Sequence, residues 1–383
     1  MSQSHILKSM SASAESNLKY WLGFNLVKGI GPAKLAILID KYGDVRSAWN
    51  ASIHDLSALG IDRRSIEAFT ELRTNVDLDR ELEAVQQAGV NLLVWESPGY
   101  PRYLKQIAHP PPLLYVRGVV DERDDWALAV VGTRRKTAYG RQVTEDLVRG
   151  LVNNGITIVS GLARGIDSIA HKTALEMSGR TIAVLGSGVD IIYPSENRSM
   201  AAEIVEGHGA LISEFPIGTK PEARNFPPRN RVISGLSMGV IVVEAGKRSG
   251  ALITADFALE QDREVFAVPG NITSPASRGT NALIQEGAKL VRDVQDVLEE
   301  LNMVMTQESA PVQMSMPESA EEVKILQSLT HQPVHIDEIT RSADLSSAVV
   351  NSTLTLMELK GMVRQVGGMQ YVLAREPEPI YDS

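Results

Sequence analysis

The sequence predicts an α/β protein in which a doubly wound, mostly parallel sheet is flanked by a small N-terminal helical domain and a C-terminal winged-helix domain. Six short, mostly β-branched runs lie between residues 127 and 270, and such runs are typical of strands buried on both faces. Helical segments separate them, which is the order of a parallel sheet. The 383 residues are also too many for one compact core.

The N-terminal part is predicted to be helical. Residues 1–14 are Ser-rich and typical of a loose tail, and residues 15–88 carry apolar residues at spacings of three and four. A Gly-rich segment, Val27–Leu35, leads into a helix with Pro32 at its start. This segment resembles a helix-hairpin-helix, whose glycine amides can approach a DNA phosphate. A tight turn in a small helical module explains it equally well, so both interpretations stay open.

The central region, residues 89–301, is predicted to contain the sheet. Its expected strands are Ala127–Gly132, Ile156–Gly161, Thr181–Gly186, Ala210–Glu214, Val240–Glu244 and Glu264–Gly270. In sheets of this type, ligands bind outside the carboxyl ends of the strands. The loops that follow these runs therefore define the expected site.

The C-terminal part is predicted to consist of a linker at residues 302–319, a winged helix at 320–375 and a tail at 376–383. The expected recognition helix, from Ser346 to Lys360, contains only Glu358 and Lys360 as charged residues. It is therefore poor in the side chains that read base edges. This favours a protein-contacting or structural module over a DNA-binding wing, although both stay open.

The composition excludes several classes of function. The net charge is −9, 43% of the residues are hydrophobic and cysteine is absent, so disulfides, thiolate metal sites and thiol nucleophiles are excluded. The chain has no apolar run near the roughly 20 residues that span a bilayer, and no signal peptide. Its histidines lack metal-ligand spacing. We therefore expect a cytoplasmic protein with no membrane contact, no metal and no cofactor.

Nucleotide-binding motifs are incomplete. Gly186-Ser187-Gly188 resembles the start of a dinucleotide fingerprint, but Ile191 stands where the third glycine belongs. The phosphate loop of ATPases, with its Gly-Lys-Ser/Thr ending, is absent from the sequence. Phosphate binding without nucleotide hydrolysis stays open.

A basic segment interrupts this acidic chain. Residues 216–248 contain six basic and two acidic residues, which indicates an anionic partner. Within them, the prolines of Asn225–Arg231 are expected to keep the backbone extended. Phe226, two guanidinium groups and amides would then project toward a phosphate backbone and a stacked base. A buried anchoring role for Phe226 is the equal alternative.

Other loops at the same edge add glycines, small hydroxyls and basic side chains. Amides at helix starts and guanidinium groups would together form an anion-binding surface. The residues expected to contact the anionic ligand are Gly132, Thr133, Arg134, Gly161, Arg164, Gly186, Gly188, Lys220, Arg224, Asn225, Phe226, Arg229, Asn230, Arg231, Lys247, Arg248, Ser249, Gly250 and Arg278.

Two acidic arrangements could carry catalysis, but a structural role is favoured for both. Asp167 and His171 are four residues apart on an expected helix, where Asp167 would cap the helix and His171 would pack or form a hydrogen bond. Glu214 and Glu244 end expected strands and would orient neighbouring basic side chains. As a pair they could instead serve a hydrolase.

These motifs resemble those of one family, the bacterial DNA processing protein A (DprA/Smf) family, over about residues 90 to 300. The segments that carry the resemblance are VVGTRRKTAYG, VSGLARGIDSIAHKTAL, GSGVDIIYPSEN, NFPPRNRVISGLS, AGKRSGALITADFALEQDREVFAVPG and SRGTNALIQEGA. The family's phosphate loop falls on Gly132–Arg134. Members often have a lysine where this chain has Ala223, so either Lys220 or Arg224 would substitute for it.

The resemblance implies a non-enzymatic protein with an extended Rossmann-like domain that binds single-stranded DNA. It further implies a homodimer that protects incoming single strands, loads the recombinase RecA during natural transformation and displaces or bypasses single-strand-binding protein. Two alternatives from other classes are a nucleotide phosphoribohydrolase-like enzyme on the same fold and a duplex-DNA regulator that acts through its winged helix.

Overall fold

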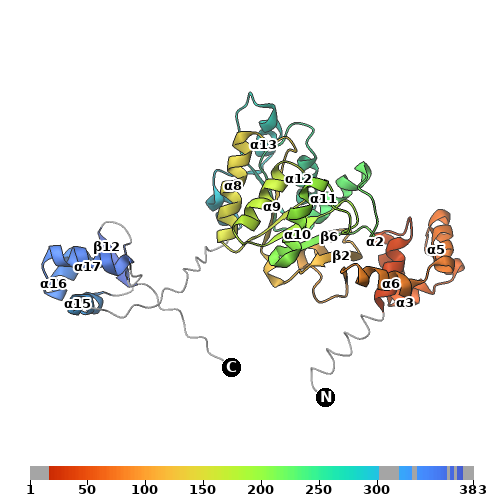
Figure 1. Ribbon diagram of the computed structural model, residues 1–383, viewed down its shortest axis with the longest axis horizontal. Helices are drawn as coiled ribbons and strands as arrows, with labels where there is room; N and C mark the ends of the chain where they lie inside the picture. The colour runs from red at the N-terminus through yellow and green to blue at the C-terminus, as the bar shows by residue number, and fades with distance from the viewer. Residues whose placement is uncertain (1–16, 302–318, 330–333, 360–362, 366–368, 374–383) are drawn as a thin grey trace, which may run out of the picture. The chain divides into compact units, whose positions relative to one another are not determined.

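The computed structural model describes residues 17–301, 319–329, 334–359, 363–365 and 369–373. The chain forms two compact units, Met1–Met305 and Thr306–Ser383, which we call unit 1 and unit 2 and describe separately (Figure 1). The predicted tails, and the predicted linker apart from residue 319, lie outside the described residues. In the described part of the chain, no helix is long and apolar enough to cross a membrane.

The N-terminal helices of unit 1 pack on the first strands of its sheet. Residues 17–26 are helical, and α2 (Pro32–Tyr42), α3 (Val45–Trp49), α4 (Ile53–Ala58), α5 (Arg63–Asn75) and α6 (Leu78–Gln87) follow. Asp44, Ser52 and Asp62 each accept a hydrogen bond from a first-turn amide, so the starts of α3, α4 and α5 are capped. Trp21 and Tyr115 belong to one apolar cluster. The predicted helical region therefore shares its core with the sheet.

The sheet of unit 1 is nine-stranded, in the order β1-β2-β6-β5-β4-β3-β7-β8-β9. Its strands are β1 (Asn91–Val94), β2 (Leu113–Gly118), β3 (Ala127–Val131), β4 (Thr157–Ser160), β5 (Thr181–Val184), β6 (Gly209–Ser213), β7 (Gly239–Val242), β8 (Glu264–Ala267) and β9 (Lys289–Leu290). The β1–β2 and β2–β6 pairs are antiparallel, and the remaining pairs are parallel. The prediction of a mostly parallel sheet is confirmed, and its six expected strands are β3 to β8.

Helices cover both faces of this sheet. One face packs against α8 (Ala138–Asn153), α9 (Ile166–Glu176), α10 (Arg198–Glu203) and α14 (Val294–Glu300), and the other against α7 (Arg102–Gln106), α11 (Phe226–Gly235), α12 (Gly250–Glu260) and α13 (Arg278–Gln285). Short 3₁₀ segments lie at Glu122–Asp125, Ser195–Asn197, Ala223–Asn225 and Pro275–Ser277, and a π segment at Ile204–His208. Alternate residues of a strand face opposite sides of the sheet. Along β3, Leu128 and Val130 therefore pack on the face covered by α8 and α9, and Ala129 and Val131 pack on the face covered by α11 and α12.

A topological switch point lies between β3 and β7. These neighbouring parallel strands continue into α8 and α12, which lie on opposite faces of the sheet. The two connecting segments therefore diverge at the carboxyl edge. Such a divergence is where doubly wound sheets form their ligand crevice.

The expectation of an extended backbone at Asn225–Arg231 is wrong. Helix α11 begins at Phe226, with prolines in its first turn. First-turn amides have no partner within the helix, so proline loses nothing there and its fixed φ favours the helix. The prolines therefore start a helix instead of keeping the chain extended.

Unit 2 has the order of a winged helix, as predicted. Its elements are α15 (Ala320–Ser328), β10 (Val334–His335), α16 (Ile336–Ala343), α17 (Ser347–Leu359), β11 (Val363–Gln365) and β12 (Gln370–Leu373). The strands pair in the order β10-β12-β11. Ile325, Ile339, Leu354 and Met357 are fully buried and join the three helices in one core.

Candidate nucleic-acid interface

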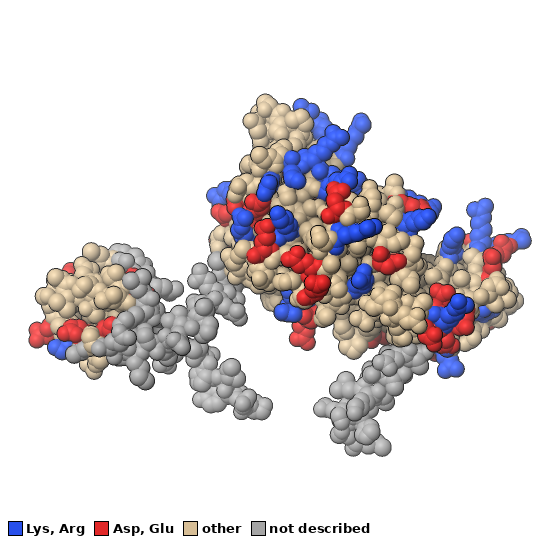
Figure 2. All heavy atoms as spheres, in the orientation of Figure 1, with Lys and Arg blue, Asp and Glu red and all other residues tan. Residues whose placement is uncertain are grey.

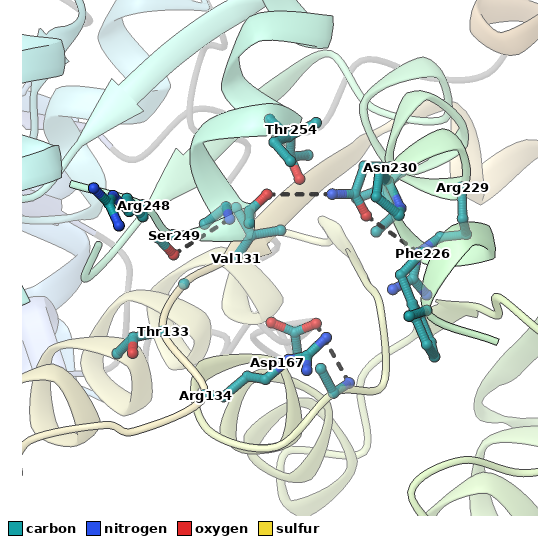
Figure 3. A pocket seen from close by; sticks show the side chains of 18 of the residues that line it. Val131, Thr133, Arg134, Asp167, Phe226, Arg229, Asn230, Arg248, Ser249 and Thr254 are labelled. Atoms are coloured by element: carbon teal, nitrogen blue, oxygen red, sulfur yellow. Dashed lines mark hydrogen bonds between the residues drawn. The ribbon is translucent and has the colours of Figure 1, made fainter. Parts of the chain in front are cut away.

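A hollow of about 920 Å³ opens at the switch point, and we call it the main hollow. It is lined by residues from the segments 131–135, 221–233 and 246–254, together with Ala163, Asp167 and Tyr193. Figure 3 shows Thr133 and Arg134 on one side of the space, Arg248 and Ser249 on a second and Phe226 with Arg229 on a third. In Figure 2, Lys and Arg side chains of unit 1 gather over the region of α12 and α13.

Hydrogen bonds to Glu244 hold the loop after β3 in place. The Thr133 amide donates to the Glu244 carbonyl at 2.8 Å, and the amide and hydroxyl of Thr137 donate to the Glu244 carboxylate at 3.0 and 2.6 Å. A side chain at Gly165 would lie 2.1 Å from the Thr133 carbonyl, and φ at Gly165 is +88°, so only glycine fits there. The exposed Arg134 side chain therefore projects from a rigid backbone.

The expected role of Glu244 as a partner of basic side chains is wrong, because its carboxylate accepts from Thr137. Glu214 does orient a basic side chain, since it accepts a short hydrogen bond from the Arg231 guanidinium. Burial raises the pKa of Glu214, and the Arg231 charge opposes that shift. Neither carboxylate lines the main hollow in the described part of the chain.

Arg229 lines the main hollow but is only 5% exposed. Its guanidinium donates to the Gly161 carbonyl at 2.9 Å and to the Val184 carbonyl. Burial lowers its pKa to about 10, although the Asp167 charge opposes that shift. Arg229 therefore joins the carboxyl ends of β4 and β5 beneath the site.

Asp167 is buried beside Arg229. The expectation that it caps α9 is wrong. Its carboxylate accepts from the amides of Gly161 and Ala163 at 3.1 and 3.4 Å, and the helix cap is Gly165. Burial raises the pKa of Asp167, and the Arg229 charge opposes that rise. Asp167 thus holds the loop that precedes α9.

His171 is also buried and forms the expected hydrogen bond. Its Nδ1 lies 2.7 Å from the Thr181 hydroxyl. Burial, with a contribution from the Arg229 charge, lowers the pKa of His171 to about 3. The His171 ring is therefore neutral near pH 7 and has the structural role that the sequence analysis favoured.

Phe226 forms a half-buried wall of the main hollow. A side chain at Gly186 would lie 2.8 Å from this ring, so the glycine lets the ring pack against the loop after β5. The guanidinium carbons of Arg134 and Arg229 each lie 5.8 Å from the ring centroid, within the range of cation–π attraction. The ring is therefore packed against the loop after β5 and also accessible from the main hollow.

The second side of the hollow is the start of α12. Ser249 caps this helix by accepting from the Ala251 amide at 3.3 Å, and the Asn230 side chain donates to the Gly250 carbonyl at 3.2 Å. The exposed Arg248 side chain precedes the cap. The amino end of a helix with an arginine before it favours binding of an anion.

The comparisons with known proteins agree with this geometry. Residues 91–302 match the family of DNA recombination-mediator protein A, and residues 309–369 match the DprA winged helix domain. The chain belongs to the DprA/Smf family. A role in DNA processing follows.

Relatives cover nearly the whole chain. Protein Smf of Synechocystis is 36% identical over 94% of this chain and 99% of its own length, and Protein Smf of Escherichia coli is 37% identical over 88% and 93%. DprA of Streptococcus pneumoniae has a similar solved structure, with TM-score 0.64 and 37% identity over 73% of this chain and 96% of its own.

A structure of DNA processing protein A from Helicobacter pylori, solved for its unique single-stranded DNA binding mode, also matches. Its TM-score is 0.50 and its identity 31%, over 56% of this chain and 97% of its own.

The main hollow brings together about half of the residues that the sequence predicts for the DprA/Smf-type site. These are Gly132, Thr133, Arg134, Phe226, Arg229, Asn230, Arg248, Ser249 and Gly250. Gly161 and Arg164 line a smaller hollow of about 40 Å³, which shares Arg134, Tyr193 and Phe226 with the main one. Gly186 packs beneath Phe226.

The remaining predicted residues do not line either hollow in the described part of the chain. These are Gly188, Lys220, Arg224, Asn225, Arg231, Lys247 and Arg278. Arg224 pairs with Glu222 at 2.7 Å, and Ala223 itself lines the main hollow. Lys220 and Arg224, the two candidates to replace the family lysine, thus both lie outside the residues that line the main hollow.

Sequence reasoning missed Arg135 and Tyr193 as lining residues. Arg135 had a signal, because it follows Arg134 in the same short loop. Tyr193 lies in the segment GSGVDIIYPSEN that carries the family resemblance, but the loop from residue 185 to 194 contains no basic residue that would mark it as an anion-binding loop.

Proposed function

We propose that this protein binds single-stranded DNA in the main hollow and acts as a recombination mediator, not as an enzyme. The observation that carries the proposal is the placement of the exposed Arg134 on a rigid loop, across from Arg248 and beside the Phe226 ring. Guanidinium groups bind phosphates bidentately, and a ring offers a face to a base. The hollow thus has separate places for the two parts of a nucleotide.

Single strands suit this hollow better than duplex DNA. Its wall contains the accessible side chains of Phe226 and Ile253, which can contact the face of an unpaired base. In a duplex the base faces are stacked on one another, and only base edges and phosphates are accessible. Binding should therefore prefer single strands, tolerate any sequence and weaken with salt.

The finer parts of the function rest on the family. We infer that this cytoplasmic protein forms homodimers, protects incoming single strands, loads RecA during natural transformation and acts where single-strand-binding protein competes. Two binding sites in one dimer would raise the apparent affinity for long strands.

The two rival functions find less support. A phosphoribohydrolase needs a free carboxylate at its ligand, but Glu244 is held by Thr137 and Glu214 by Arg231. Asp167 does line the hollow, but its carboxylate accepts from two backbone amides and is buried beside Arg229. A duplex regulator needs a basic recognition helix, but α17 contains one charged residue, Glu358. If the protein released free base from nucleoside monophosphates, the phosphoribohydrolase function would replace our proposal.

A fluorescence anisotropy titration against salt tests the proposal. Labelled single-stranded and duplex oligonucleotides of equal length are compared on wild type, Arg134→Ala and the control Arg63→Ala. Arg63 is 92% exposed on α5, away from the hollow. We expect Arg134→Ala to weaken single-strand binding about tenfold or more and to reduce the slope of log affinity against log salt by about 0.7.

Three results separate the possibilities. Equal wild-type affinity for single strands and duplex contradicts the proposal. If Arg134→Ala binds single strands as tightly as wild type, the binding site does not lie in the main hollow. If binding is lost when residues 320–383 are removed, the winged-helix rival replaces it.

A further inference from the structure

Tyr193 is an exposed ring on the wall between the two hollows. It lies in the loop after β5, its side chain is 46% exposed, and it lines both the main and the smaller hollow. Its ring centroid is 5.7 Å from that of Phe226, with an angle of 40° between the planes. The proposed function so far gives this ring no role.

The neighbours of Tyr193 make a continuous surface. Phe226 is held against Gly186, and the Arg134 guanidinium lies over the Phe226 ring. The smaller hollow, which Tyr193 and Arg134 also line, contains Arg164, whose side chain is 62% exposed and pairs with Glu196 at 2.6 Å. Two rings therefore lie side by side, with exposed basic side chains beside them.

This order matches the repeat of a single strand. Along a strand, bases and phosphates alternate, so a groove that binds more than one nucleotide needs ring faces with cations between or beside them. The main hollow supplies one such position, at Phe226 and Arg134. Tyr193 and Arg164 supply the same two chemistries at the next position.

We propose that Tyr193 is a stacking platform for a second unpaired base, and that the strand continues from the main hollow across Tyr193 toward Arg164. The inference rests on the proposed single-strand binding and names a second subsite for it. The ligand class is any nucleotide with an accessible base face. The ring, not the hydroxyl, carries the interaction, so recognition is independent of base identity.

The test uses oligonucleotides that keep every phosphate but lack bases. Affinities of the full-length protein for oligo(dT) and for an abasic oligomer of equal length are measured with wild type, Tyr193→Ala and Tyr193→Phe. Trp126→Ala is the matched control, because Trp126 is a 52% exposed ring just before β3, at the opposite edge of the sheet. Arg134→Ala reports on the proposed function itself.

We expect Tyr193→Ala to weaken oligo(dT) binding roughly five- to a hundredfold, as loss of one base–ring stack does, and to leave abasic binding almost unchanged. Tyr193→Phe and Trp126→Ala should bind like wild type. If Tyr193→Ala binds oligo(dT) normally while Arg134→Ala does not, the second subsite is wrong and the function stands. An equal loss for both oligomers would also overturn the platform, because it reveals a purely structural role. If neither variant affects binding, the proposed function fails as well.

Discussion

Replacement of Arg229 by alanine should destabilise unit 1 strongly. The side chain is 5% exposed, lies beside the buried Asp167 carboxylate and donates to the carbonyls of Gly161 and Val184. Its removal leaves a buried acid without its countercharge, which costs about 3–5 kcal/mol, and removes the donor from two carbonyl oxygens. Each kcal/mol lowers Tm by about 2–4 °C for domains of about 150–250 residues, and by less for a larger unit such as unit 1. A fall of roughly 5–8 °C is therefore expected.

Thermal and urea unfolding of the full-length protein measure this effect, with Arg134→Ala as the matched control. Arg134 is exposed at the same site, so its removal should change the free energy of unfolding by less than about 0.5 kcal/mol. The two variants thus separate a residue that builds the site from one that we propose contacts DNA. If Arg229→Ala unfolds at the wild-type midpoint, the buried bridge between β4 and β5 does not exist as described.

Two further predictions concern charge. Glu196 forms an ion pair with Arg164 at 2.6 Å. Glu196→Gln should therefore free the Arg164 guanidinium and tighten binding of strands that reach the smaller hollow about two- to fivefold. Fluorescence anisotropy at low salt measures this affinity, and weaker binding by the variant would contradict the prediction. The low pKa of the buried His171, about 3 against 6.5, means that only the unfolded chain takes up this proton as pH falls below 6.5. The free energy of unfolding should therefore fall toward pH 4 by up to about 1.4 kcal/mol per pH unit through this residue. Urea midpoints of His171→Gln should show a shallower fall, and an equal slope would disprove the assignment.

The strands and the phosphate loop were predictable because their signals are local. Leu128 and Val130 alternate with Ala129 and Val131 within one short run, and Gly132–Arg134 follows it directly. The edge strands β1 and β9, and β2 next to β1, were missed as strands, and β9 has only two residues. The prolines of α11 were misinterpreted because proline is compatible with both an extended chain and a helix start.

The roles of individual charged residues could not be predicted, because they depend on distant partners. Arg229 and Arg231 are two apart in the sequence, yet one is buried against the ends of β4 and β5 and the other pairs with Glu214. Counting charges in a segment cannot separate these positions. Tyr193 was missed for the same reason, since its exposure on the wall of the hollow depends on where the loop after β5 meets α11.

The central claim is that single-stranded DNA occupies the main hollow at the switch point. Photo-crosslinking of the full-length protein to an oligonucleotide with 5-iododeoxyuridine, followed by peptide mapping, tests it most directly. We predict crosslinks in the segments 186–200 and 221–235, which contain Tyr193 and Phe226. Crosslinks confined to α17 or to the Gly-rich segment before α2 would contradict the claim.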